Sequence, residues 1–319
     1  MIATDLLLII FFSLLLIKAT DVLLINLKSF SKQMKIGAFA SGGLVVALAT
    51  SLPELFVGLA AALRGEPSLS LGNVVGANIA NLSLVIGGAA LIGGTLKVQG
   101  NFLSRDVFYA FLAGATPMLL LIDKVLSRTD GLILLVIYLF YQVVIFRQQD
   151  KGAAAEEGIV NRLIHRISLQ GTKKEIFWIL VGIVVLLFYA NMLVGLGSKV
   201  ALTLNLPILV VGMVWIAIGT TLPELIFEAE AIKNRQPEMV FGNLLGSIVA
   251  NATLVLGLVA LISPIRIEAF AQYLLATIAF VLIFGLFYFF IRTKRRLERW
   301  EGATLALVWL AFVLAEFLK

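Results

Sequence analysis

The sequence contains no cysteine and only one histidine, His165, among its 319 residues. The absence of cysteine excludes disulfide bonds, thiolate metal sites and catalysis by a thiol. The lone histidine leaves no nucleophile–base pair and no histidine-based metal motif of the kind that hydrolases use. We therefore expect neither enzymatic activity nor a bound cofactor.

Charged residues are also scarce: they make up 14% of the chain, whereas hydrophobic residues make up 61%. Soluble domains average about 25% charged and about 45–50% apolar residues. So much apolar surface cannot be hidden from water in a chain of this size, so the expected solvent and first partner is the lipid bilayer. The net charge of +6 does not indicate a nucleic-acid partner, because the basic residues collect in alternate loops. No obligate protein partner is evident.

Long apolar runs dominate what is present. About 20 apolar residues cross a bilayer, and the sequence offers ten such runs, at residues 2–27, 36–63, 69–92, 107–122, 131–146, 176–204, 206–232, 239–262, 269–291 and 303–317. We predict an all-α polytopic membrane protein with ten transmembrane helices. The first run is too long for a signal peptide and no basic residue precedes it, so no cleaved signal is expected.

The distribution of lysine and arginine predicts the orientation. Most of the 25 basic residues lie in alternate loops, and the positive-inside rule assigns those loops to the cytoplasm. We therefore expect a protein of the cell membrane with both termini outside the cell. The long polar stretch at 148–174 is predicted to be a cytoplasmic linker between a first five-helix unit, 1–147, and a second, 175–319.

The two units contain a repeat. Residues 42–87 align without a gap with residues 212–257, and the matches include proline, glutamate, glycine and asparagine as well as apolar residues. Because five crossings is an odd number, equivalent helices of the two units must run in opposite directions. The sequence thus predicts an inverted-topology repeat, an arrangement in which transporters bind substrate near the bilayer midplane between the repeats.

The first half of each repeat carries the pattern A-x-x-T-[ST]-L-P-E, which ends in Glu54 and Glu224. A carboxylate this deep in an apolar helix is costly and is a functional hypothesis by default. No lysine or arginine in the same runs is deep enough to pair with it, so we expect a cation or protons from solution. Pro53 and Pro223 each free a backbone carbonyl one turn earlier. Hydroxyls lie beside these prolines, at Thr50, Ser51, Thr220 and Thr221.

The second half of each repeat carries G-N-x-x-G-[AS]-x-x-[AN]-N, which ends in Asn81 and Asn251. The glycines are four residues apart, which allows close helix packing. The two terminal asparagines lie at a depth comparable with that of the glutamates. They are candidate ligands, with hydrogen bonding between helices as the structural alternative.

Together these residues offer carboxylate, amide, hydroxyl and carbonyl oxygens without nitrogen or sulfur ligands. Such donors suit Ca²⁺, which takes 6–8 oxygens in adaptable geometry, whereas Mg²⁺ gives up its water reluctantly. Zinc, copper or nickel would favour imidazole or thiolate. Calcium is preferred, and manganese stays an alternative.

The paired motifs resemble the two alpha-repeat signatures of the prokaryotic sodium/calcium exchangers, a family of the calcium/cation antiporter superfamily. The resemblance covers the whole chain and implies an antiporter that exchanges Ca²⁺ for Na⁺ by alternating access. It implies that Glu54 and Glu224 bind Ca²⁺ and Na⁺ at different times. Further oxygens would then come from Thr50, Thr220, Asn81 and Asn251 and from the backbone carbonyls of Ala47 and Ala217.

Two positions differ from that pattern. Ala77 stands where relatives often have a serine, although the equivalent Ser247 is present, and Asn251 stands where they have an aspartate in some cases. The first difference removes a hydroxyl expected at a Na⁺ subsite. Proton/calcium exchangers typically have a glutamate at the positions of Ala77 and Ser247, so Na⁺ is the preferred counter-ion and H⁺ the alternative. A cation channel would use the same oxygens without counter-ion dependence.

Three further polar residues lie in the apolar runs. Glu228, which is matched by Gly58 in the first half, is either a proton relay or a salt-bridge partner of Lys233 or Arg235. Asp21 and Asn191 occupy equivalent places in the first and sixth runs and mark a possible entry path. A local pair with Lys18 is the alternative explanation for Asp21.

Overall fold

The computed structural model describes residues 2–33, 50–97, 102–149, 173–233 and 237–317. The predicted ligand Ala47 lies outside these residues. The predicted linker at 148–174 also lies outside them, except for 148–149 and 173–174 at its two ends. The described helices are α1 (Ile2–Gln33), α3 (Leu52–Leu63), α4 (Pro67–Ala80), α5 (Ile86–Gly93), α6 (Phe102–Leu120), α7 (Arg128–Gln149), α9 (Lys173–Leu204), α10 (Ile208–Val211), α11 (Ala217–Lys233), α12 (Pro237–Val249), α13 (Leu256–Ile262), α14 (Phe270–Lys294) and α15 (Arg299–Phe317).

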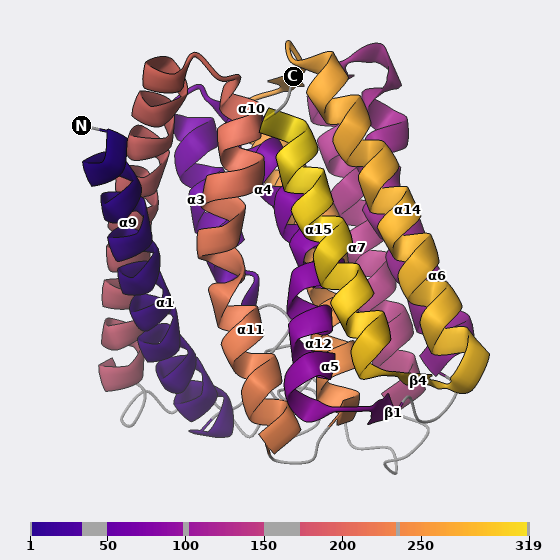
Figure 1. Cartoon of the computed structure of the whole chain (residues 1–319). Coiled ribbons are helices and arrows are strands. Elements are labelled where there is room, and N and C mark those ends of the chain that lie inside the picture. The colour runs from indigo at the N-terminus through magenta and orange to yellow at the C-terminus, as the bar shows by residue number, and fades with distance from the viewer. Residues whose placement is uncertain (1, 34–49, 98–101, 150–172, 234–236, 318–319) are drawn as a thin grey trace.

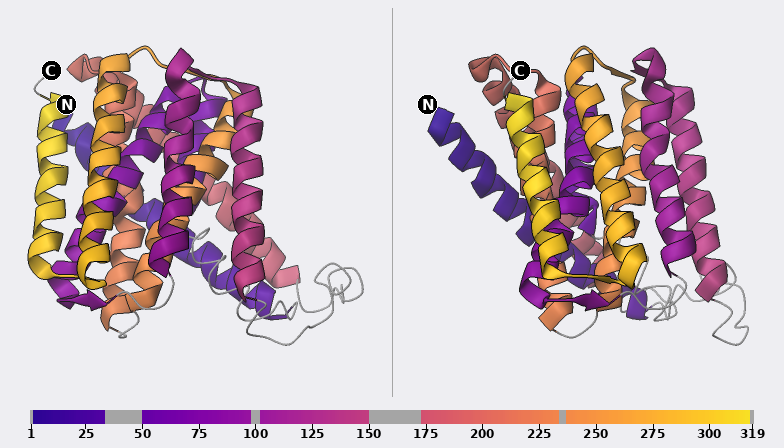
Figure 2. Two further views of the ribbon diagram at one scale, coloured as in Figure 1. Left: turned by 90° about the vertical axis from the view of Figure 1, so that its right-hand side faces the viewer. Right: turned by 45° about the vertical axis from the view of Figure 1, so that its right-hand side comes forward.

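The helices form one bundle of roughly aligned rods (Figure 1). Eight helices of the described residues are long and apolar enough to cross a membrane. Large apolar side chains cover their outer faces, as at Phe11, Ile133, Val184 and Leu282. A surface of this kind is stable only against lipid. Helix α1 begins and α15 ends at the same end of the bundle, as an even number of crossings requires (Figure 2).

Within the described residues, three π-helical turns interrupt otherwise continuous helices. They are η1 (Asn81–Val85) between α4 and α5, η3 (Gly212–Ile216) between α10 and α11, and η4 (Ala250–Val255) between α12 and α13. The first and third occupy equivalent places in the two repeats. A π turn adds a residue to the helical ring and is frequent at functional sites. The predicted ligands Asn81 and Asn251 lie in these turns.

Glycine allows the two repeats to touch backbone to backbone. A side chain at Gly72 would overlap the carbonyl of Leu209, and one at Gly76 would overlap the carbonyl of Met213. On the facing helix, a side chain at Gly212 would overlap the carbonyl of Leu69. Close packing by the motif glycines is confirmed at Gly72 and Gly76, where it brings α4 against α10 and η3, but the prediction is wrong at Gly242, where an added Cβ would meet no atom within 4 Å.

The buried apolar residues form two clusters. One joins α4–α7 with α12–α15 and contains side chains such as Phe241, Phe280 and Phe287. The other joins α1 and α9 to α3 and to η3, with Leu16 and Leu193 among its members. Helices α1 and α9 lie side by side along one flank of the bundle (Figure 1). Their packing is therefore distinct from that of the larger group of helices.

Short strands tie the two halves together at the helix ends. Strand β1 (Leu96–Lys97) pairs with β4 (Arg296–Leu297), and β2 (Val125–Leu126) pairs with β3 (Ile265–Arg266), both antiparallel. Next to β4, Trp300 Nε1 and Lys294 Nζ both donate to Glu298. The Trp300 hydrogen bond and the neighbouring cations lower the pKa of Glu298 from 4.5 to about 2.

Candidate cation-binding site

The two motif glutamates lie deep in the bundle. Glu54 is in the first turn of α3 and Glu224 is near the middle of α11, and both side chains are fully buried. Their carboxylates are close enough to interact electrostatically. Among the described residues, none of their four carboxylate oxygens has a hydrogen-bond partner. Buried polar atoms are almost always paired in proteins, so these oxygens indicate a site for a cation.

The prolines act differently in the two halves. Pro53 lies in the first turn of α3, where proline is tolerated because the first N–H groups of a helix need no partner within it. Pro223 lies inside α11, which continues through it to Lys233. Ala49, whose carbonyl we predicted to be freed by Pro53, lies outside the described residues. In the second half, the predicted loss of the bond to Gly219 does not end the helix.

Two threonine hydroxyls link the halves across the site. Thr50 Oγ1 donates to Asn243 Oδ1 at 2.9 Å, and Thr220 Oγ1 donates to Asn73 Oδ1 at 3.1 Å. The two bonds are equivalent under the repeat, because each joins the first half of one repeat to the second half of the other. Thr50 Oγ1 also lies 3.1 Å from the hydroxyl of Ser247. Thr50, Thr220 and Ser247 are thus all buried, and each lies beside a polar side chain of the other half.

The asparagines that end the second motif of each repeat are buried polar residues as well. Asn81 and Asn251 are both buried, and neither Asn81 Oδ1 nor Asn251 Oδ1 has a hydrogen-bond partner among the described residues. The Ser51 hydroxyl is buried and unpartnered in the same way. These three oxygens, together with the glutamates, make up a group of neutral and acidic donors in a region without bulk water.

The remaining predicted ligands of the second half are engaged locally. Thr221 Oγ1 donates to the carbonyl of Ala217 at 2.9 Å, and Thr220 Oγ1 lies 3.3 Å from the same carbonyl. The Ala217 carbonyl therefore has hydroxyl partners within its own helix in this structure. No contact in the described residues joins Thr221 to the glutamates.

Some asparagines that form hydrogen bonds in this region were not predicted from the sequence to have a role in the site. Asn73 and Asn243 accept hydrogen bonds from the threonine hydroxyls described above, although neither was predicted from the sequence to be a ligand. Asn78 was not singled out at all, yet its Oδ1 accepts a hydrogen bond from Asn251 Nδ2 at 3.2 Å. The available signal was its position, three residues before Asn81 on a helix of small residues.

Glu228 is a third buried carboxylate, 1% exposed and one turn beyond Glu224. Neither of its oxygens has a hydrogen-bond partner in the described part of the chain. Lys233 is exposed, and no salt bridge between it and Glu228 is present among the described residues. The salt bridge that we considered with Lys233 is therefore not formed; Arg235 lies outside the described residues. Glu228 does interact electrostatically with Glu224.

The donor set consists of oxygen atoms. The described residues contain no group of three or more histidine, cysteine, aspartate or glutamate side chains arranged to hold a metal ion. A cation here would instead combine two carboxylates with amide, hydroxyl and carbonyl oxygens. That mixture matches calcium or sodium and does not match zinc or copper.

Comparison with known proteins places this site in a family. The family model described as "Sodium/calcium exchanger protein" matches residues 4–147 and 174–318, which is most of the chain. The chain belongs to the sodium/calcium exchanger family. Its members are transporters, and this chain is accordingly a multi-pass membrane protein of a transporter family.

Two relatives illustrate the family's range. The inner membrane protein YrbG of Escherichia coli is 30% identical over 262 residues, which cover 81% of this chain and 80% of YrbG. The sodium/calcium exchanger MaX1 of Methanosarcina acetivorans is 25% identical over 95% of both chains.

The fold is that of a solved exchanger. The sodium-calcium exchanger NCX_Mj, soaked with 10 mM Na⁺ and zero Ca²⁺, superposes with a TM-score of 0.64 at 24% identity over 99% of both chains. The predicted architecture, ten transmembrane helices in two inverted five-helix repeats, is confirmed.

Proposed function

We propose that this exchanger carries Ca²⁺ across the membrane in exchange for Na⁺, and that it binds both ions between Glu54 and Glu224. The observation that carries the proposal is the set of buried, unpartnered carboxylate oxygens on α3 and α11. Two facing carboxylates repel each other when the site is empty, and a divalent cation removes that repulsion. The relative MaX1 is itself named a sodium/calcium exchanger.

The remaining ligands of the proposed site are neutral. Asn81, Asn251 and Ser51 supply unpartnered oxygens. The hydroxyls of Thr50, Thr220, Thr221 and Ser247 and the carbonyls of Ala47 and Ala217 would join when the ions are bound. Two or more Na⁺ ions in place of one Ca²⁺ would need several cages of such neutral oxygens.

A proton-coupled exchanger is the second candidate, and Glu228 is the observation that favours it. Its buried carboxylate has no partner among the described residues and lies beside the motif pair. A buried carboxylate without a counter-charge is favoured in its neutral, protonated form. A proton on Glu54 or Glu224, relayed by Glu228, would substitute for the Na⁺ that Ala77 disfavours.

We further propose that transport proceeds by alternating access, with α1 and α9 moving as a pair past the other helices. Their separate apolar cluster supports a pair that keeps its own packing during movement. Both termini would face outside the cell, with 148–174 as a cytoplasmic linker between repeat units 1–147 and 175–319.

The test is ion exchange in liposomes. Purified protein is reconstituted, and uptake of radioactive Ca²⁺ is followed against an outward Na⁺ gradient, an outward proton gradient, and neither. Uptake driven by Na⁺ supports the first proposal, and uptake driven by protons alone supports the second. Ca²⁺ uptake that needs neither a counter-ion nor its gradient would identify a channel and overturn both proposals.

A further inference from the structure

Asn78 links the site to the interior of the bundle. It is 3% exposed and lies on α4, three residues before Asn81. Its Oδ1 accepts a hydrogen bond from Asn251 Nδ2 at 3.2 Å, and its own Nδ2 lies 3.5 Å from the carbonyl oxygen of Ile248. A peptide carbonyl can only accept, so this contact turns the Asn78 amide nitrogen toward Ile248 and its oxygen toward Asn251.

The orientation of Asn251 follows from that of Asn78. An amide has one donor end and one acceptor end, so Asn251 must direct its nitrogen at the Asn78 oxygen. Its own oxygen, Oδ1, then has no partner in the described residues and is buried. This is the arrangement that a cation requires, because only the oxygen of an amide is a ligand for calcium or sodium.

The repeat supplies a comparison within the molecule. Asn78 is equivalent to Ile248, and Asn251 is equivalent to Asn81. The side chain of Ile248 cannot form the corresponding hydrogen bond to Asn81. Consistent with this, neither side-chain atom of Asn81 has a hydrogen-bond partner among the described residues. One of the two central amides is therefore held in position and the other is not.

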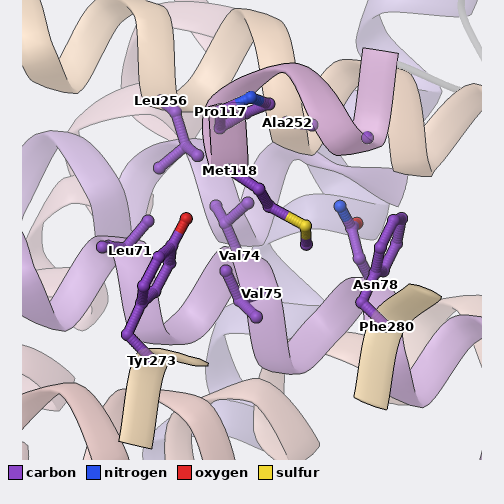
Figure 3. Close-up of a pocket in the computed structure, with 11 residues that line it drawn as sticks. Leu71, Val74, Val75, Asn78, Pro117, Met118, Ala252, Leu256, Tyr273 and Phe280 are labelled. Carbon is purple, nitrogen blue, oxygen red and sulfur yellow. The ribbon is translucent and has the colours of Figure 1, made fainter. Parts of the chain in front are cut away.

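A small cavity lies behind Asn78 and limits what else could bind it. Helices α4, α6, α13 and α14 and the turn η4 line it, and its side chains are mostly apolar. Figure 3 shows Asn78 beside Phe280, with the Tyr273 ring on the other side. The cavity volume of about 10 Å³ accommodates at most one water molecule. Asn78 therefore faces no bulk solvent there that would compete with Asn251.

We propose that Asn78 is a positioning residue of the exchanger, which holds the Asn251 amide with its oxygen toward the cation bound by Glu54 and Glu224. Asn78 itself does not contact the ion. The proposal rests on the proposed function, since it assigns Asn251 as a ligand of the transported cation. It assigns unequal parts to the two asparagines that the motifs present as equivalent.

The experiment is a double-mutant cycle with Asn78→Leu and Asn251→Ala in proteoliposomes, read as the Ca²⁺ concentration that gives half-maximal exchange. Asn78→Leu keeps the branched shape and the number of heavy atoms and removes the acceptor, so this concentration should rise about 5- to 10-fold, the effect of one lost hydrogen bond. The maximal rate should change little. In the Asn251→Ala background, Asn78→Leu should have no further effect.

Met118→Leu is the matched control, because Met118 lines the same cavity and has an apolar side chain; its half-maximal concentration should equal that of the unmodified protein. Independent, additive effects of Asn78→Leu and Asn251→Ala would overturn the proposal, as would an unchanged half-maximal concentration in Asn78→Leu.

If Asn78→Leu does not yield a monodisperse protein, Asn78→Ala takes its place in the same cycle, with the same two outcomes. Glu54→Gln is assayed alongside. Loss of exchange in Glu54→Gln together with additivity at Asn78 would reject this inference alone. Normal exchange in Glu54→Gln would reject the proposed function first.

Discussion

In the first half of the chain, Glu54 lies in the opening turn of α3, a helix that begins at Leu52; in the second half, Glu224 lies inside α11, which runs unbroken from Ala217 to Lys233. The two carboxylates are nevertheless equally buried and equally without hydrogen-bond partners in the described residues. The backbone around each acid therefore differs, while its burial and its lack of hydrogen-bond partners are the same.

The side chains around the acids differ more. Gly58 leaves no room for a side chain, since a Cβ there would lie 2.9 Å from Ser70 Oγ and 3.0 Å from a Val255 methyl carbon, whereas the equivalent Glu228 is a buried acid. Ala77 and its equivalent Ser247 differ in the same way, by one polar group. These pairs show that the two halves differ at positions near the glutamates, although the glutamates themselves are the same in both.

The largest loss of exchange is expected when one of the two glutamate carboxylates is removed, because the two halves then no longer match at the acid. Glu54→Gln and Glu224→Gln should each reduce Ca²⁺-driven exchange about 100-fold or more, because truncating one partner of a buried charge interaction costs several kcal/mol. The protein should stay folded, as glutamine has the same shape. Exchange rates in proteoliposomes measure the loss of transport, and circular dichroism in detergent measures whether the protein stays folded. The exposed Glu268→Gln is the control. Normal Ca²⁺ affinity in both variants would refute the site.

The long helices α1 and α9 offer a second way to test the halves against each other. Arg64 Nε donates to Asn191 Oδ1 at 2.5 Å, and Ser198 donates to Glu66, so α9 is tied to the turn between α3 and α4. A cleavable cross-link between Glu66→Cys and Ser198→Cys should abolish exchange and spare Ca²⁺ binding. The natural absence of cysteine makes the link specific.

Reductive cleavage of this link should restore transport, and Ser198→Cys alone is the control. Full exchange in the cross-linked protein would show that α9 does not move relative to that turn.

A smaller effect is expected at Glu228, a carboxylate whose equivalent in the first half is Gly58. If protons contribute to coupling, Glu228→Gln should reduce exchange driven by a proton gradient several-fold and leave exchange driven by Na⁺ nearly unchanged. Among the described residues, Glu224 interacts electrostatically both with Glu228 and with Glu54. Equal losses with both gradients would indicate a packing role for Glu228.

The smallest effect is expected from making the halves alike at Ala77. Ala77→Ser restores the hydroxyl that Ser247 supplies on the other side, so the Na⁺ concentration for half-maximal Ca²⁺ release should fall about 2- to 5-fold, within the range of one hydrogen-bonding group. Flux is measured against separate Na⁺ and pH gradients. Steep Na⁺ dependence that is identical in the unmodified protein would show that Ala77 does not limit coupling.

The sequence was sufficient for the features that repeat. Apolar length placed the helices, and a glutamate in each apolar motif predicted burial at Glu54 and Glu224, because hydrophobic neighbours leave no other environment. The glycine spacing predicted the backbone contacts of Gly72 and Gly76. These inferences succeeded because each depends on a local pattern that lipid or close packing enforces.

Other features left no such pattern. A π turn adds one residue to a helix whose faces are all apolar, so η1 and η4 do not disturb any visible periodicity. Strands of two residues are too short to give a pattern. The contact of Asn78 with Asn251 joins positions far apart in the chain, and Asn78 has no polar counterpart in the second half. Only the assembled bundle brings the two together.

The hydrogen bonds from Thr50 to Asn243 and from Thr220 to Asn73 cross from one five-helix unit to the other. Neither unit therefore contains a finished site. An ancestral protein of five helices would have had the same chemistry only as a pair of identical copies inserted in opposite orientations. In the present chain, the two units have to be inserted into the membrane in opposite orientations. A unit inserted in the wrong orientation would leave the threonines and asparagines of both units without their hydrogen-bond partners.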